Sequence, residues 1–336
     1  MERKKVVIFG GGTGTSYVLK GLKYFPIDIT AVISVKVKEP QPSEYKLLKK
    51  NQILFTYLQL AIEKSLTKEL ISKKVTSVAY ETIQKPDGTL PLLLPMSEVA
   101  GKMSIQIAAN LLENRNQGAG ILLGGIAGVP AGKVLIVGAG NVGFNAAKIA
   151  VGMGANVSIV DIDTDKLRAV DNAFGSKIKT YVSSESIIKE LIKDADVLIG
   201  AVLIPGHKAP RIITEEMVKL MKKGSVIVDV SIDQGGIVET IDRITTHENP
   251  SFEKHGVIHY SVANIPGCVA RTSTIALTNE TIKYLLNIAN EGLVEAIKAD
   301  SSLACGINTF NGHLTNKGVA EALNLEYVEL TSLIGF

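Results

Sequence analysis

The sequence predicts an α/β protein that contains a Rossmann-type doubly wound parallel sheet and a second, discontinuous α/β substrate domain. Three observations predict this class. Short apolar segments alternate with helical segments through the middle of the chain. A Gly-x-Gly-x-x-Gly turn separates the first of these strands from the first helix. A further α/β region precedes this unit, and a helical region follows it.

The central strands are expected at residues 134–138, 157–161, 179–183, 196–202, 225–231 and 257–263. Segment 226–230, Val-Ile-Val-Asp-Val, is apolar enough for burial on both faces of a sheet. Segment 214–223 has acids early and lysines late, as the helix dipole prefers, and therefore predicts one of the intervening helices.

The region before this unit also contains apolar strand segments and helical segments, and the region after it contains helical segments, although their patterns are weaker. Strands are expected near 5–9, 29–37 and 75–80, and helices near 15–24, 42–49, 65–73, 279–298 and 316–323. Ser97 is expected to cap a long helix that runs to about residue 114. We therefore assign 97–271 to a nucleotide-binding domain, and 1–96 with 272–336 to a substrate-type domain.

Composition excludes several classes of protein. The 336 residues carry a net charge of +3, and Lys and Arg form no stripe, which argues against nucleic-acid binding. The uncharged stretch 118–132 is too short to span a membrane, and glycines interrupt the apolar run after the basic start. Cys268 and Cys305 form no Cys-x-x-Cys pair, so neither a disulfide framework nor a metal site is expected. These features together predict a cytoplasmic protein.

The glycine turn predicts a dinucleotide cofactor. Gly138 permits the tight turn, Gly140 lets the backbone approach a pyrophosphate, and Gly143 permits close packing of helix on strand. Asp161 ends the second strand 23 residues after Gly138 and would bind a ribose diol while repelling a 2′-phosphate. We therefore expect NAD rather than NADP. The alternative is a tight glycine turn in an ordinary α/β domain.

Longer segments carry a family resemblance. They are 36–40 (Lys-Val-Lys-Glu-Pro), 53–58, 79–82, 95–101, 201–206, 228–236, 262–264 and 271–274. From Lys36 onward the chain resembles NAD-dependent alanine dehydrogenase. The resemblance implies reversible oxidative deamination of L-alanine to pyruvate and ammonia, with NAD taking the hydride. It also implies a two-domain fold with an active-site cleft and a homohexamer.

Three polar residues receive catalytic or binding roles from this resemblance. Lys38 would hold the substrate carboxylate or polarise the carbonyl oxygen, although a surface cation at a strand end is the alternative. Asp233 would be the catalytic aspartate; otherwise it caps the next helix. Asn264 would contact nicotinamide or substrate, and a structural amide at a strand end is its alternative.

Further residues would line the cofactor site. By the same resemblance, Met96 and Ser97 would line the cleft, with Ser97 also contacting cofactor. Lys166 would reach the adenosine ribose, unless it is a solvated helix lysine. Ala201, Val202 and Leu203 would form a wall for the nicotinamide, although sheet packing alone would select the same residues.

The chain departs from the family pattern at the acid–base residue. Gln59 stands where the family has histidine, and an amide cannot exchange a proton near neutral pH. His207 follows the expected nicotinamide wall, and is either a substitute base or an exposed turn histidine.

The start of the chain is the second departure. Residues 1–34 lack the family's substrate-binding arginine segment and resemble the opening of the gluconeogenesis-factor and phospholactate-transferase family. The join would lie near Ser34 to Lys36. Impaired alanine dehydrogenase activity, an NAD-binding relic, and a phosphometabolite- or nucleotide-binding regulator that uses the Gly10–Gly14 loop are the functions left open.

Overall fold

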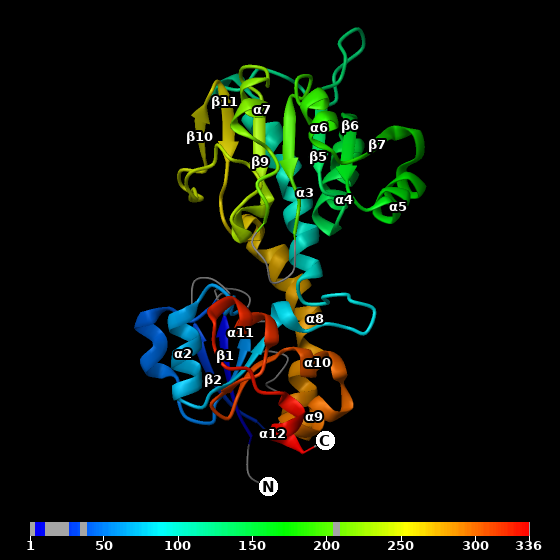
Figure 1. The fold of residues 1–336 in the computed structure, drawn as a ribbon. Coiled ribbons are helices and arrows are strands. Elements are labelled where there is room, and N and C mark those ends of the chain that lie inside the picture. The colour runs from blue at the N-terminus through cyan, green and yellow to red at the C-terminus, as the bar shows by residue number, and fades with distance from the viewer. Residues whose placement is uncertain (1–3, 11–26, 34–38, 204–208, 336) are drawn as a thin grey trace. The chain divides into compact units, whose positions relative to one another are not determined.

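The computed structural model describes residues 4–10, 27–33, 39–203 and 209–335. These residues form two compact units (Figure 1). The first unit contains Met1–Met96 and Val269–Phe336, and the second contains Ser97–Cys268. The predicted helix at 15–24 lies outside the described residues. Within them, no helix is both long and apolar enough to cross a membrane.

The second unit contains a seven-stranded sheet of order β10-β11-β9-β8-β5-β6-β7. Its strands are β5 (Lys133–Val137), β6 (Asn156–Asp161), β7 (Ile178–Val182), β8 (Val197–Gly200), β9 (Val226–Asp229), β10 (Ser251–Lys254) and β11 (Val257–Tyr260). All neighbours pair in parallel except β10, which pairs antiparallel with β11. From β7 to β11 this is the dinucleotide-binding order 3-2-1-4-5-6, whose direction of winding reverses at β5.

Helices cover both faces of this sheet (Figure 1). They are α3 (Leu94–Leu111), α4 (Asn141–Gly152), α5 (Thr164–Phe174), α6 (Glu185–Leu191) and α7 (Glu215–Lys219). Val134 and Ile136 of β5 belong to one apolar core with α3, α4 and α5. Leu135 and Val137 belong to a second core with α6 and α7. Because successive strand residues face opposite sides, the apolar strand sequence is used on both faces.

Short 3-10 helices complete this unit at η3 (Asn114–Asn116), η4 (Gly175–Lys177), η5 (Val230–Gln234) and η6 (Ile265–Val269), the last of which ends at the boundary residue. Thr214 caps α7 by accepting the N–H of Met217 on its hydroxyl. Asp163 caps α5 in the same way, through the N–H groups of Asp165 and Lys166. These local caps explain why the helices begin where the sequence changes from apolar to polar.

The first unit is built on a six-stranded sheet of order β13-β12-β4-β3-β1-β2. The strands are β1 (Lys4–Gly10), β2 (Ile27–Ile33), β3 (Ile53–Thr56), β4 (Thr76–Ala79), β12 (Ile307–Phe310) and β13 (His313–Leu314). Strands β1 to β4 pair in parallel, and β12 joins β4 antiparallel. Segments from both ends of the chain therefore share one sheet.

Helices and two apolar clusters surround this sheet. The elements are η1 (Pro42–Leu47), α2 (Lys64–Ser72), η2 (Tyr80–Thr82), α8 (Ala270–Glu291), α9 (Leu293–Ala299), α10 (Ser301–Cys305), α11 (Lys317–Leu323) and α12 (Leu330–Ile334). One cluster joins α8 to β3, β4 and β12. The other joins α2 and α11 to β3. Gly292, with φ of 85°, separates α8 from α9.

The predicted fold class is confirmed, and several details are corrected. Ser97 does not cap α3, because the helix begins three residues earlier at Leu94, and Pro95 suits the first helical turn. The single helix expected at 279–298 is two helices broken at Gly292. Segment 42–49 forms a 3-10 helix rather than an α-helix. Strands β3, β10, β12 and β13 were not expected.

Candidate active site

The predicted glycine turn lies between β5 and α4. Gly138 has φ of 105°, and a Cβ there would stand 2.5 Å from the carbonyl oxygen of Ala201. A Cβ on Gly143 would stand 1.8 Å from the carbonyl oxygen of Gly138. Both positions therefore require glycine, one for its backbone conformation and both for the closeness of neighbouring backbone.

Gly140, in contrast, has open space where a Cβ would stand. A Cβ there would meet no described protein atom within 4 Å. Gly140 is also the N-cap of α4, and no side chain caps that helix end. The first N–H groups of α4 are thus left for another partner, and the helix dipole favours an anion there. This open, uncapped turn fits the pyrophosphate of a dinucleotide.

Asp161, at the end of β6, is bonded to the same turn. Its Oδ2 accepts the N–H of Ala139 at 2.6 Å, and its Oδ1 accepts the N–H of Asp163 at 2.9 Å. An ionised carboxylate has about four acceptor positions, so both oxygens retain capacity for a ribose diol. The arrangement fits NAD. Lys166 is exposed, and its Nζ lies 3.7 Å from the carboxylate of Asp163.

The expected nicotinamide wall follows β8 directly. Ala201 is buried and donates its N–H to the carbonyl of Val137 at 2.8 Å. Val202 donates its N–H to the hydroxyl of Ser231 at 3.0 Å, and Leu203 is 42% exposed. Packing therefore accounts for Ala201, whereas the exposed apolar side chain of Leu203 has no such explanation.

The structure brings Asp233 and Asn264 together. Asp233 lies in η5 after β9, and its Oδ1 accepts the N–H of Asn264 at 3.1 Å. Asn264 has a left-handed backbone with φ of 58°. Loss of water around the carboxyl raises the pKa of Asp233, and the N–H of Asn264 partly offsets this rise. Both residues follow the carboxyl ends of parallel strands, where ligands bind in such sheets.

Sequence reasoning missed Asp229, which is fully buried at the end of β9. It accepts N–H groups from Ser231, Ile237 and Val238. Burial raises its pKa to about 6, while these N–H groups and the charge of Arg211 act in the opposite direction. The sequence did contain a signal for Asp229, because an acid within an apolar strand is expected to be buried. A buried carboxylate needs hydrogen-bond partners.

Gln59 lies in the first unit, shortly after β3. Its side chain is exposed, its φ is 49°, and its N–H donates to Oε1 of Glu81 at 2.7 Å. Burial raises the pKa of Glu81, and the N–H groups of Gln59 and Leu58 lower it. Tyr57 packs edge-on against Tyr80 and donates its hydroxyl to the carbonyl of Leu92 at 2.7 Å. Sequence reasoning did not single out Glu81 or Tyr57.

The remaining expected residues separate into two groups. Met96 is partly buried against the α8 cluster of the first unit, and Ser97 is half-buried in the first turns of α3. Lys38 and His207 lie outside the described residues, as does most of the Gly10–Gly14 loop.

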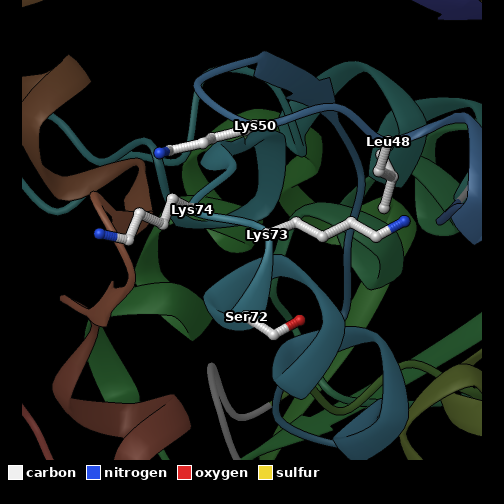
Figure 2. A pocket seen from close by; sticks show the side chains of 5 residues that line it. All are labelled: Leu48, Lys50, Ser72, Lys73 and Lys74. Atoms are coloured by element: carbon white, nitrogen blue, oxygen red, sulfur yellow. The ribbon is translucent and has the colours of Figure 1, made fainter.

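A basic depression lies elsewhere in the first unit. It measures about 400 Å³ and is lined by Leu48, Lys50, Ser72, Lys73 and Lys74 (Figure 2). The ammonium groups of Lys50 and Lys74 lie on one side, while Lys73 extends toward Leu48 (Figure 2). Lys73 bonds the carbonyl of Tyr45 and pairs with Glu69. None of the expected site residues lines this depression. Across the described ranges, no three His, Cys, Asp or Glu side chains gather as metal ligands would.

The winding order, open glycine turn and acid of β6 are typical of the dinucleotide-binding domains of dehydrogenases. Residues 27–100 match the family model "Alanine dehydrogenase/PNT, N-terminal domain", and residues 104–317 match "Alanine dehydrogenase/PNT, C-terminal domain". The chain belongs to the alanine dehydrogenase/PNT family. The match begins at residue 27, so it includes the segment 27–35 that we expected to precede the resemblance. The resemblance of residues 1–34 to another family stays a prediction.

Curated relatives agree with this assignment. The chain is 54% identical to "Alanine dehydrogenase 2" of Staphylococcus aureus (strain USA300) over 314 residues, which cover 94% of this chain and 83% of the relative. It is 57% identical to "Alanine dehydrogenase" of Staphylococcus epidermidis (strain ATCC 12228 / FDA PCI 1200) over 296 residues, covering 88% and 80%.

Solved structures agree as well. An L-alanine dehydrogenase aligns with a TM-score of 0.82 and 44% identity, covering 88% of this chain and 84% of the other. A transhydrogenase from Sinorhizobium meliloti aligns with a TM-score of 0.76 at 20% identity, covering 93% of this chain and 100% of the other. The second match supports the shared fold alone.

Proposed function

We propose that this chain catalyses the reversible, NAD-dependent oxidative deamination of L-alanine to pyruvate and ammonia. The observation that carries the proposal is the 54% identity to a curated alanine dehydrogenase over 94% of the chain. The open turn at Gly140 and the acceptor Asp161 supply the cofactor chemistry that this reaction needs. When bound, NAD accepts the hydride that leaves the α-carbon of alanine.

Protein groups would hold the cofactor at both ends. The N–H groups at the start of α4 would bind the pyrophosphate, and Asp161 would accept the ribose hydroxyls. A 2′-phosphate would be repelled by the same carboxylate, which favours NAD over NADP. We assign the nicotinamide to the segment Ala201–Leu203 because it follows β8 beside the point where the winding reverses.

Asp233 is the proposed acid–base or orienting group. Hydration of the iminium requires a proton to be moved, and a carboxylate with a raised pKa is better matched to that task near neutral pH. Lys38 would bind the substrate carboxylate by similarity to the family. Asn264 would act beside Asp233, because its backbone N–H already bonds that carboxylate.

Gln59 supports a second candidate, an NAD-binding protein with weak turnover. An amide cannot replace the histidine of the family in proton exchange, and loss of such a group typically costs roughly 10²–10⁴-fold in rate. The two candidates share lineage and cofactor, and they differ in whether the chain oxidises alanine at a measurable rate.

One assay separates the two candidates. Purified protein is given NAD and L-alanine at alkaline pH, and NADH absorbance is followed against a control without alanine. NAD binding is measured in the same preparation by calorimetry. Alanine-dependent NADH formation supports the dehydrogenase, and binding without it supports the weak-turnover candidate. Protein that binds no NAD would refute both.

We further propose a homohexamer and a cytoplasmic location. The first rests on similarity to the family, and the second on the free thiols of Cys268 and Cys305. Sedimentation equilibrium of the purified protein tests the assembly, and fractionation of the source cells tests the location.

A further inference from the structure

The buried carboxylate of Asp229 is bonded to both ends of the segment that carries Asp233. Its Oδ1 accepts the N–H of Ser231 at 3.0 Å, ahead of Asp233. Its Oδ2 accepts the N–H groups of Ile237 at 2.8 Å and Val238 at 3.2 Å, beyond Asp233. One side chain therefore closes the loop at its start and at its end.

Backbone packs closely around this carboxylate. A Cβ on Gly200 would stand 2.8 Å from Oδ1, and a Cβ on Gly236 would stand 2.7 Å from Oδ2. Gly236 also has φ of 76°, which suits glycine. Gly200 is the last residue of β8 and directly precedes the expected nicotinamide wall. The residue before the nicotinamide wall and the end of the Asp233 loop therefore both lie close to the carboxylate of Asp229.

A second hydrogen bond extends this connection. The hydroxyl of Ser231 accepts the N–H of Val202 at 3.0 Å, while the N–H of Ser231 donates to Asp229. Arg211 is the charged group that faces the carboxylate, and its guanidinium donates to the carbonyl of Val238 at 2.6 Å. All of these groups belong to the second unit.

We propose that Asp229 is a positioning residue that fixes the Asp233 loop and, through Ser231, the nicotinamide-facing segment at Val202. It acts through these backbone groups and does not itself touch substrate or cofactor. The proposal rests on the proposed function, since that function assigns roles to Asp233 and Val202. A buried carboxylate with only a stabilising role would not need the hydrogen-bonded connection that Ser231 makes to the segment at Val202.

Asp229→Asn tests the proposal, because the new amide turns an acceptor into a donor that faces N–H groups. Asp196→Asn is the matched control. Asp196 is also a buried acid of this sheet, at the opposite end of β8, where it accepts the N–H of Lys133 at 2.8 Å and the ammonium of Lys222 at 2.9 Å. Both substitutions should lower the melting temperature.

The deciding measurement is affinity for NADH relative to ADP-ribose, which lacks the nicotinamide. Calorimetry on the purified full-length protein gives both dissociation constants. We expect Asp229→Asn to reduce the preference for NADH by about tenfold, which corresponds to about 1.4 kcal/mol, and to leave ADP-ribose binding unchanged. Asp196→Asn should leave the preference unchanged. Ser231→Ala, which keeps the buried charge, should reduce it by about threefold.

The outcomes separate this proposal from the proposed function. An unchanged preference in both Asp229→Asn and Ser231→Ala would overturn the positioning role. Equal loss in Asp196→Asn, or a wild-type protein that does not prefer NADH, would overturn it as well. If Asp229→Asn does not fold, Ser231→Ala decides alone. Absence of alanine turnover in the wild type would refute the dehydrogenase activity and leave these binding ratios interpretable.

Discussion

Oε1 of Glu81 accepts the backbone N–H of Gln59 at 2.7 Å, and the same carboxylate accepts the N–H of Leu58 at 3.2 Å. These bonds hold residue 59 in a left-handed backbone conformation, with φ of 49°. The anchor is made to the main chain, so it does not depend on which side chain occupies position 59. Another side chain can therefore be introduced there without removing the bonds that direct it.

Gln59→His should raise the rate of alanine oxidation by roughly 10²–10⁴-fold, because imidazole restores a proton-exchanging group. Initial rates of NADH formation at saturating NAD and alanine measure the effect. Gln84→His is the matched control, since Gln84 is also exposed in the first unit and bonds only the carbonyl of Gly88 among the described contacts. Equal rates for wild type and Gln59→His would show that residue 59 takes no part in proton transfer.

Asp233→Asn should lower kcat by roughly 10²–10⁴-fold, because the amide cannot exchange a proton. The amide oxygen can still accept the N–H of Asn264, so the melting temperature should stay close to that of the wild type. Steady-state kinetics and thermal unfolding measure the two effects. Asp242→Asn, at an exposed acid paired with Arg243, should change neither. A kcat that survives Asp233→Asn would exclude this carboxylate as the acid–base group.

Gly143→Ala should lower stability, whereas Gly140→Ala should weaken NAD binding. A Cβ at 143 would stand 1.8 Å from the carbonyl oxygen of Gly138, so Gly143→Ala should reduce the free energy of unfolding by about 1–3 kcal/mol or more. A Cβ at 140 meets no described atom within 4 Å, so Gly140→Ala should retain stability and weaken NAD binding. Denaturant unfolding and calorimetry check both effects. NAD affinity that is unchanged in Gly140→Ala would argue against a pyrophosphate at this turn.

The pH dependence of stability should reveal Asp229. Its pKa is raised from the ordinary value of 3.8 to about 6 by burial, so the folded state binds more protons than the unfolded state between these values. The contribution of Asp229 to stability is therefore fully present below pH 3.8 and is lost as pH rises through about 6. The free energy of unfolding of the wild type, minus that of Asp229→Asn, should fall across this window.

His259 provides a comparison of opposite sign. It is buried, bonds Thr240 through Nε2, and burial lowers its pKa to about 4. Its contribution to stability therefore rises with pH between about 4 and its ordinary value of 6.5. Denaturant titrations of wild type, Asp229→Asn and His259→Gln at closely spaced pH values measure both differences. Differences that do not change with pH would contradict the raised pKa of Asp229 and the lowered pKa of His259.

The nucleotide-binding fold was predictable from its pattern of apolar residues. Its strands are apolar on both faces, whereas its helices also carry polar residues. Val134 to Val137 form an unbroken apolar run in the sequence, and the structure places alternate residues of this run in two cores. Strand β3 was missed because Ile53–Thr56 is a short apolar run, and such a run fits a strand or a buried helix equally well. Strand β10 was missed because Ser251–Lys254 is a polar edge strand, whose pairing depends on β11 rather than on its own propensity.

The candidate site was predictable where a motif fixes a backbone shape. Gly138, Gly143 and Asp161 are such residues, because their spacing alone implies the turn. Asp229 and Glu81 were not predictable in the same way. Glu81 accepts the N–H of Gln59, far away in the chain, and Asp229 accepts the N–H of Ile237 across a loop; both pairings are set by the fold. Hydrogen bonds to the main chain leave no pairing signal in a single sequence.

The two bonds of Asp161 limit how this protein can change its choice of cofactor. The carboxylate that would discriminate against a 2′-phosphate also bonds Ala139 within the glycine turn. Exchanging it for a small neutral residue would admit the phosphate and at the same time leave a main-chain donor without its acceptor. A lineage moving toward NADP would have to acquire a replacement acceptor first. The proposed preference for NAD is thus tied to the integrity of the fold, and single substitutions should be poor routes to altering it.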